Sequence, residues 1–153
     1  FMIKISFMVP QEKEIHDIHQ YVWVLQGSML VAVPNDETVK AVTLEEAPCR
    51  DDNLENGKGI PIYIGIKGRD ICLACEMSGK AAVLQLLNKK IWDLYQSKEA
   101  QLPFVFYRNY TGSTHTLESA ACPGWFICTS REQNQPVKMT QNLGKHNTAF
   151  YLN

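Results

Sequence analysis

No run of apolar residues in this 153-residue chain approaches the roughly 20 needed to span a bilayer, so membrane insertion is not expected. Charge of one sign is also missing, because 15 Lys and Arg stand against 16 Asp and Glu, for a net charge of −1. The basic residues are scattered singly, whereas nucleic-acid binding usually needs a broad basic field. Hydrophobic and charged shares of 45% and 20% instead indicate one globular domain with a buried core.

Helical spacing of apolar residues is nearly absent. Only "NKKIWDLYQSKE", residues 88–99, places Ile91, Leu94 and Tyr95 on one face, which predicts one or two helical turns. Elsewhere, short runs rich in Val, Ile, Thr and aromatics, such as "YVWVLQ" and "IPIYIGI", alternate with turn residues. Regularly spaced runs of this kind predict an all-β sandwich or barrel.

The strand pattern also repeats along the chain. Laying residues 72–86 on residues 125–139 superposes four apolar pairs, and the last two recur once more near the N-terminus. The pairs are Leu73 with Phe126, Cys75 with Cys128, Leu84 with Val137 and Leu86 with Met139, and the earlier positions are Leu30 and Ala32. Three hairpin repeats that close a barrel predict a β-trefoil over residues 15–153, preceded by a flexible lead over residues 1–14.

The cysteines do not form an obvious disulfide, metal or catalytic set. Their odd number, five, argues against a complete disulfide framework. Cys72 and Cys75 form a CxxC, but residues three apart in a strand face opposite ways, and no second pair supplies the remaining zinc ligands. A nucleophilic Cys122 or Cys128 would need a histidine partner, and the histidines show no partnered spacing. We therefore expect the thiols to act as small core residues, with no enzyme activity and no cofactor.

A second metal hypothesis concerns "EIHDIHQYV". His16, Asp17 and His19 supply three ligand types in four residues, but they leave a structural zinc site one ligand short. A solvated segment that leads into the first strand is the favoured interpretation, and no metal is expected.

The segment "LESAACPGWFICTS", residues 117–130, followed by "VKM" at 137–139, resembles the signature of the interleukin-1 family. The family pattern usually opens with Phe or Cys, where this chain has Leu117. Three further segments, "VWVLQGSMLVAVP", "IPIYIGIKGRDICLACE" and "LGKHNTAFYLN", are similar to the interleukin-36 subfamily in order and spacing. The resemblance runs from about Ile15 to Asn153. "IHD" and the signature also resemble interleukin-37, and the receptor antagonist of the group is a third alternative.

The resemblance implies a β-trefoil cytokine that joins an interleukin-36-type receptor to the interleukin-1 receptor accessory protein and triggers pro-inflammatory signalling. It implies a monomer before receptor binding, without catalysis, that waits in the cytoplasm and is secreted by an unconventional route without a signal peptide. An anti-inflammatory or antagonist member is the alternative. An intracellular role and a lectin or protease-inhibitor trefoil are more distant, because one fold serves many functions.

The family resemblance also implies N-terminal processing. Ile15-His16-Asp17 matches an aliphatic-x-Asp motif, and trimming a short fixed distance upstream of it places the mature start near Ser6.

Receptor contacts are expected in loops, where the strand alternation breaks and a rigid barrel holds the connecting segments. Ala149 matches a position at which family agonists and antagonists differ, and its small side chain is consistent with an agonist. The candidate contact residues are His16, Asp17, His19, Asp51, Asp52, Lys67, Arg69, Arg131, Glu132, Asn142, Lys145, His146, Asn147 and Ala149.

Overall fold

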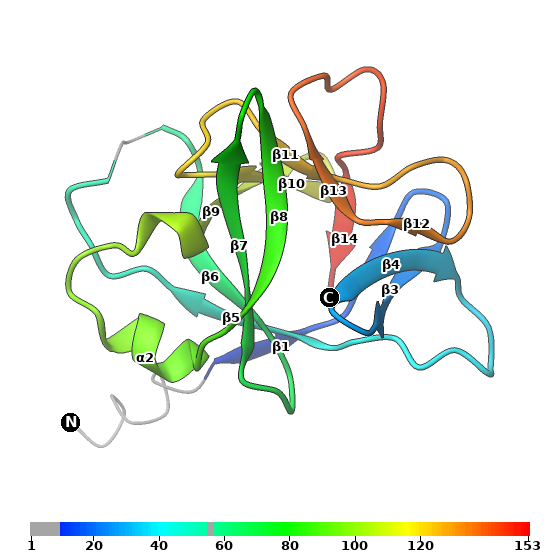
Figure 1. The fold of residues 1–153 in the computed structure, drawn as a ribbon, viewed down its shortest axis with the longest axis horizontal. Helices are drawn as coiled ribbons and strands as arrows, with labels where there is room; N and C mark the ends of the chain where they lie inside the picture. The colour runs from blue at the N-terminus through cyan, green and yellow to red at the C-terminus, as the bar shows by residue number, and fades with distance from the viewer. Residues whose placement is uncertain (1–9, 55–56) are drawn as a thin grey trace.

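The computed structural model describes residues 10–54 and 57–153, which form a largely antiparallel β structure (Figure 1). The strands, in chain order, are β1 (Gln11–Lys13), β2 (Ile15–Asp17), β3 (Tyr21–Gln26), β4 (Met29–Pro34), β5 (Leu44–Pro48), β6 (Ile60–Ile66), β7 (Ile71–Ser78), β8 (Ala81–Asn88), β9 (Val105–Thr111), β10 (Thr114–Ser119), β11 (Phe126–Cys128), β12 (Gln135–Pro136), β13 (Lys138–Thr140) and β14 (Phe150–Leu152). The expected all-β class is confirmed.

Strands β1 and β2 together close a barrel. Five barrel strands pair in the order β5–β6–β9–β10–β14. In this series β5 and β14 are the two edge strands. β1 pairs with β5, and β2, which begins two residues after β1 ends, pairs with β14. Between them, Glu14 exchanges two backbone hydrogen bonds of 3.0 Å with Asn153. The paired barrel strands therefore form a closed ring, in which each of these strands has a partner on both sides.

Three strand pairs cap the barrel: β3 with β4, β7 with β8, and β11 with β13. Figure 1 shows β7 and β8 as a long hairpin that rises beside the barrel strands. One hairpin for each third of the chain is the β-trefoil arrangement predicted from the repeats.

The repeat alignment is wrong by one residue in one strand. Leu86 pairs across its hairpin with Leu73, whereas Met139, which is equivalent to Leu86, pairs with Ile127 and not with Phe126. Ile127 and Leu73 are both 0% exposed, while Phe126 is half-buried. The third member is Trp23, which pairs with Ala32 and is also 0% exposed. Because successive strand residues face opposite sides, a one-residue slip exchanges core and surface.

The short helix α2 (Ile91–Gln96) confirms the single helical prediction. Ile91 and Leu94 are its buried residues, and the helix packs against β5 and β6. It covers a second apolar cluster that contains Tyr63 and Val105 and is separate from the main core. A 3-10 turn, η1 (Leu102–Phe104), then leads into β9. Within the described part of the chain, no helix is both long and apolar enough to cross a membrane.

The signature segment is a structural corner. The Ser119 hydroxyl accepts a 2.9 Å hydrogen bond from the Cys122 amide, and the Glu118 carboxylate accepts one of 2.8 Å from the Gly124 amide. Gly124 has φ +85°, a conformation that favours glycine, and the chain turns there into β11. Ile127, two residues beyond Trp125, joins the main core, and Trp125 packs against it. Ser119 and Glu118 therefore satisfy backbone amides of this turn.

The cysteines are all free and all buried. Cys72 belongs to the cluster under α2 and Cys75 to the main core, so the two faces of β7 separate them as expected. Burial raises the pKa of each of these thiols to about 12 and that of Cys128 to about 11. Their role as small core residues is confirmed.

The N-terminal segment differs from its prediction. Residues 11–13 were assigned to a flexible lead, but they form β1 and pair with β5. Residues 15–17, read as a solvated approach to the first strand, form β2, in which Ile15 and Asp17 are buried. Both segments are too short and too polar to be recognised as strands without their partners, because pairing with β5 and β14 is what defines them.

Candidate functional site

A surface cleft gathers three segments that are far apart in the sequence. It has a volume of about 280 Å³ and is lined by residues from the β2–β3 connection, from the loop after β11 and from the loop before β14. The lining residues are Ile18, His19, Arg131, Leu143, Gly144, Lys145, His146, Asn147, Thr148 and Ala149. Six of them, His19, Arg131, Lys145, His146, Asn147 and Ala149, are candidates predicted from the sequence. We call this the loop cleft.

The loop cleft combines positive charge with two apolar side chains. Arg131 and Lys145 are exposed at its wall, and no Asp or Glu is among the described residues that line it. Ile18 and Leu143, which are 52% and 53% exposed, lie together in the lining of the loop cleft. A basic surface with exposed aliphatic groups suits a partner that presents acidic and apolar groups.

A buried hydrogen-bond network connects the segments behind the loop cleft. The Asp17 carboxylate accepts hydrogen bonds from the His19 amide at 2.8 Å, the Tyr21 amide at 3.0 Å and the Thr129 hydroxyl at 2.8 Å. The Thr129 hydroxyl in turn accepts a 3.2 Å hydrogen bond from the Asn147 side-chain amide. The Asp17 carboxylate therefore links the β2–β3 connection to Thr129, and through Thr129 to Asn147 in the loop before β14. Hydrogen bonds to a charged acceptor are strongest away from water.

Two further contacts fix the walls. The Tyr21 hydroxyl donates a 3.0 Å hydrogen bond to the backbone carbonyl of Arg131. The Asn142 side-chain oxygen accepts a 3.2 Å hydrogen bond from the Gly144 amide, which shapes the turn that carries Lys145. Asn142 thus lies just outside the lining and positions it. Glu132 is exposed beside Arg131 and is not part of the lining.

The expectation that Asp17 contacts a receptor is wrong. Asp17 instead supports the loops of the cleft from inside the protein. It is 0% exposed, and its carboxylate oxygens are occupied by the three donors above, so the side chain cannot reach a receptor. His16, which precedes it, stacks on Tyr151 with ring centroids 4.7 Å apart and lines a different cleft of about 350 Å³. Within residues 10–54 and 57–153, no group of three His, Cys, Asp or Glu side chains is placed to hold a metal ion.

The remaining candidates lie elsewhere. Lys67, in the β6–β7 turn, forms a 3.0 Å ion pair with Glu12 of β1, and Arg69 is exposed in the same turn. Asp51 accepts hydrogen bonds from the Asn53 and Ala100 amides at 2.9 and 2.8 Å, and Asp52 is exposed beside it. These hydrogen bonds hold the pKa of Asp51 below its ordinary value. Neither pair lines the loop cleft. Ser6 lies outside the described residues.

Four lining residues of the loop cleft are not among the candidate contact residues: Ile18, Leu143, Gly144 and Thr148. Leu143 lies in the turn over residues 142–147, which the broken strand alternation predicts as a contact loop, but neither Leu143 nor Ile18 was chosen as a contact residue. The available signal was their position, since each is an aliphatic residue flanked by polar residues in a segment without strand alternation.

Comparison with known proteins decides the family. The family model described as Interleukin-1 / 18 matches residues 34–152, which is most of the chain. The chain belongs to the interleukin-1 family. It is 44% identical to human interleukin-36 alpha over 143 residues, covering 93% of this chain and 90% of that protein. It is 42% identical to mouse interleukin-36 beta over 150 residues, covering 96% of this chain and 81% of that protein.

Solved structures agree with the sequence comparison. An NMR structure of the pro-inflammatory cytokine interleukin-36alpha matches with a TM-score of 0.81 and 42% identity, over 95% of this chain and 94% of that one. The protein is therefore a β-trefoil cytokine of the interleukin-1 family, similar to the interleukin-36 members.

Proposed function

We propose that this interleukin-1 family protein is an extracellular agonist that binds an interleukin-36-type receptor and recruits the interleukin-1 receptor accessory protein. The observation that carries the proposal is the similarity to interleukin-36 alpha along 93% of the chain. The solved relative of comparable similarity is described as a pro-inflammatory cytokine, which favours signalling over antagonism.

The loop cleft supplies the proposed contact surface. A specific protein interface buries about 800 Å² on each partner, so the loop cleft forms one part of a larger surface. His19, Arg131 and Lys145 would face acidic groups of the receptor, while Ile18 and Leu143 would be buried against apolar groups. The network around Asp17 keeps these loops in one arrangement before binding, which lowers the ordering cost of association.

The second cleft, which contains His16, and the exposed turns with Asp52 and with Lys67 and Arg69 remain proposed contacts for a second receptor chain. They lie outside the loop cleft, as a ligand that joins two receptors requires two separate surfaces.

Processing at Ser6 is part of the proposal. β1 starts at Gln11, so a chain that begins at Ser6 keeps both strands that close the barrel and only five residues before them, positions 6–10. The residues removed, positions 1–5, lie outside the described part of the chain and precede β1 in the sequence. Residues upstream of Ser6 would obstruct the receptor surface or misplace the first strand, which is how trimming would raise activity.

Charge reversal at the loop cleft tests the contact. Arg131→Glu combined with Lys145→Glu is expected to reduce the association rate with the immobilised receptor ectodomain by on the order of tenfold, because rim charges steer encounter. Lys98→Glu, an exposed lysine outside the loop cleft, is the matched control and is expected to bind as the parent does. Equal association rates for both variants would show that the loop cleft is not at the interface.

A reporter assay in cells that carry only this receptor pair separates the alternatives. Receptor binding with accessory-protein recruitment and signalling supports the agonist. Binding without recruitment identifies an antagonist, and the absence of binding to either receptor removes the proposal.

A further inference from the structure

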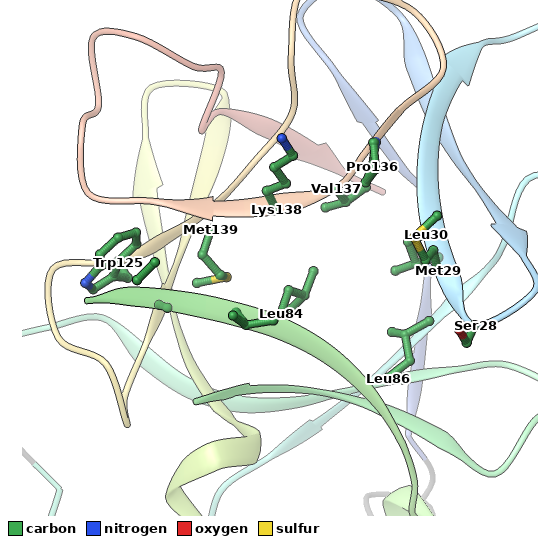
Figure 2. Close-up of a pocket in the computed structure, with 13 residues that line it drawn as sticks. Ser28, Met29, Leu30, Leu84, Leu86, Trp125, Pro136, Val137, Lys138 and Met139 are labelled. Atoms are coloured by element: carbon green, nitrogen blue, oxygen red, sulfur yellow. The ribbon is translucent and has the colours of Figure 1, made fainter. Parts of the chain in front are cut away.

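A mainly apolar cavity, distinct from both clefts described above, lies where the three capping hairpins converge (Figure 2). It has a volume of about 390 Å³ and is lined by the β3–β4 turn, by the start and middle of β8, and by β12 and β13 with Trp125. This is the lower part of the range for small-molecule sites, about 300–1,000 Å³. We call it the hairpin cavity. It shares no lining residue with the loop cleft.

The trefoil repeat explains why the walls are apolar. Leu30, Leu84 and Val137, which are equivalent in the three repeats, all line the cavity. Leu86 and Met139, which are equivalent positions in two of the repeats, also line the cavity, two residues further along their strands. Figure 2 shows these side chains directed toward one another from β4, β8 and the β12–β13 segment. Equivalent inward-facing positions must meet on the axis of a threefold repeat, so each hairpin supplies one side of a common apolar wall.

The same repeat explains why the space is open. The outermost layer places Ser28 and Ala82 at equivalent positions, and Ala81 lies beside Ala82 at the start of β8. These side chains are too short to meet across the axis. The mouth is therefore left unfilled although close packing is the rule in protein interiors.

The lining also selects the charge of an occupant. Lys138 is the one charged residue among the described residues that line the hairpin cavity. Its neighbours Val137 and Met139 are buried and face inward, whereas Lys138 is exposed. In Figure 2 its ammonium end points away from Leu84, toward the outside of the cavity. A ligand would therefore meet apolar walls, with one positive charge on the outer side of the segment that forms one of these walls (Figure 2).

We propose that the hairpin cavity binds a single medium-chain aliphatic carboxylate. The alkyl chain lies between Leu84, Leu86 and Met139, where burial of its methylene groups is favourable. The carboxylate remains at the mouth, in contact with water and within the field of Lys138. A cationic head group would meet repulsion there, and a peptide of more than a few residues exceeds a space of about 390 Å³.

Methyl NMR of the full chain with labelled methionines tests the site, with decanoate as the probe at concentrations below micelle formation. Met29 and Met139 line the cavity, whereas Met77 is an exposed methionine outside the lining and serves as an internal control. Saturable shifts of Met29 and Met139 with a fixed Met77 are expected. Each methylene added between hexanoate and decanoate should tighten binding roughly two- to fourfold.

Head-group and variant comparisons decide the rest. Lys138→Gln should weaken decanoate binding by about two- to fivefold, as expected for one exposed ion pair. Lys98→Gln, an exposed lysine elsewhere, should leave it unchanged. Ala81→Leu, at the mouth, should reduce binding while urea unfolding shows a folded chain. Decylamine binding as tightly as decanoate, shifts at all three methionines alike, or no saturable shift would overturn the proposal.

Discussion

The carboxylate of Asp17 and the hydroxyl of Thr129 are joined by a buried hydrogen bond of 2.8 Å across 112 positions of sequence. Thr129 also exchanges backbone hydrogen bonds of 2.9 and 3.0 Å with Asn147. Asp17 belongs to the motif that the family resemblance connects with processing, and Asn147 belongs to the loop cleft. The motif therefore has a structural reason of its own, since it fixes the N-terminal connection against the loops that form the proposed receptor surface.

Removal of this carboxylate should destabilise the fold. We expect Asp17→Ala to lower the free energy of unfolding by about 3 kcal/mol, because buried donors lose a charged acceptor. Asp17→Asn, which keeps the shape and one acceptor oxygen, should cost less. Urea unfolding measures both, and Asp52→Ala, at an exposed carboxylate, should change stability by less than about 0.5 kcal/mol.

A double-mutant cycle isolates the pair itself. Asp17→Ala and Thr129→Val should be non-additive by about 1 kcal/mol or more, since each removes the same hydrogen bond. Strict additivity would mean that the bond contributes nothing to stability.

The register of β11 predicts that truncating the smaller side chain, Ile127, costs more stability than truncating the larger one, Phe126. Ile127→Ala should cost about 2–5 kcal/mol because Ile127 lies in the core, opposite Met139. Phe126→Ala removes a larger but half-buried side chain and should cost only about 1 kcal/mol. Thermal or urea unfolding of the two variants gives the order directly. A larger loss of stability in Phe126→Ala would instead support the alignment of Phe126 with Leu73 that the sequence predicts.

The signature corner predicts a contrast between two serines. Ser119→Ala should lower stability by about 1–3 kcal/mol, because the buried Cys122 amide loses its acceptor. Ser130 accepts a similar hydrogen bond, of 3.1 Å, from the Glu132 amide, but it lies at the surface, where water can replace the hydroxyl. Ser130→Ala should therefore cost less than about 0.5 kcal/mol. Equal losses in urea unfolding would argue that burial of the corner is unimportant.

The buried thiols predict a loss of stability in alkali. Burial raises the pKa of Cys75 to about 12, above its ordinary value of 9.0, so the folded state holds this proton more tightly than the unfolded state does. Its contribution is complete below pH 9 and falls as the pH rises toward 12. Between pH 9 and pH 10 the parent should lose about 1 kcal/mol more than Cys75→Ala does. Identical pH dependence of urea unfolding in the two proteins would contradict a buried thiol.

Trimming at the N-terminus should change potency and leave stability unaltered. A form starting at Ser6 retains β1 and β2, so its unfolding should match that of the full chain, while its half-maximal concentration in the receptor-reporter assay should fall. A form with residues 1–5 replaced by a Gly-Ser segment of equal length separates the effect of length from that of sequence. If the chain starting at Phe1 is as potent as the one starting at Ser6, the processing proposal fails.

Much of the fold follows from local patterns. Short apolar runs rich in Val, Ile, Thr and aromatics predicted the long strands, and the spacing of Ile91, Leu94 and Tyr95 predicted α2. The recurrence of Leu30, Leu84 and Val137 predicted the threefold arrangement, and these residues meet at one cavity. The strands and the helix are encoded within a few residues, because strand and helix periods depend only on neighbours along the chain, and the repeat is visible as a recurrence of such local patterns.

Tertiary structure alone decided the rest. Phe126 and Ile127 are both apolar, so alternation could not choose between them, and the pairing of Ile127 with Met139 placed one of the two in the core. Asp17 looked like a surface acid, and only Thr129 and the adjoining amides made its burial favourable. The chemistry of a side chain determines which bonds it can form, but its environment depends on partners far away in the sequence, as Thr129 is from Asp17. Those partners come together only when the barrel closes.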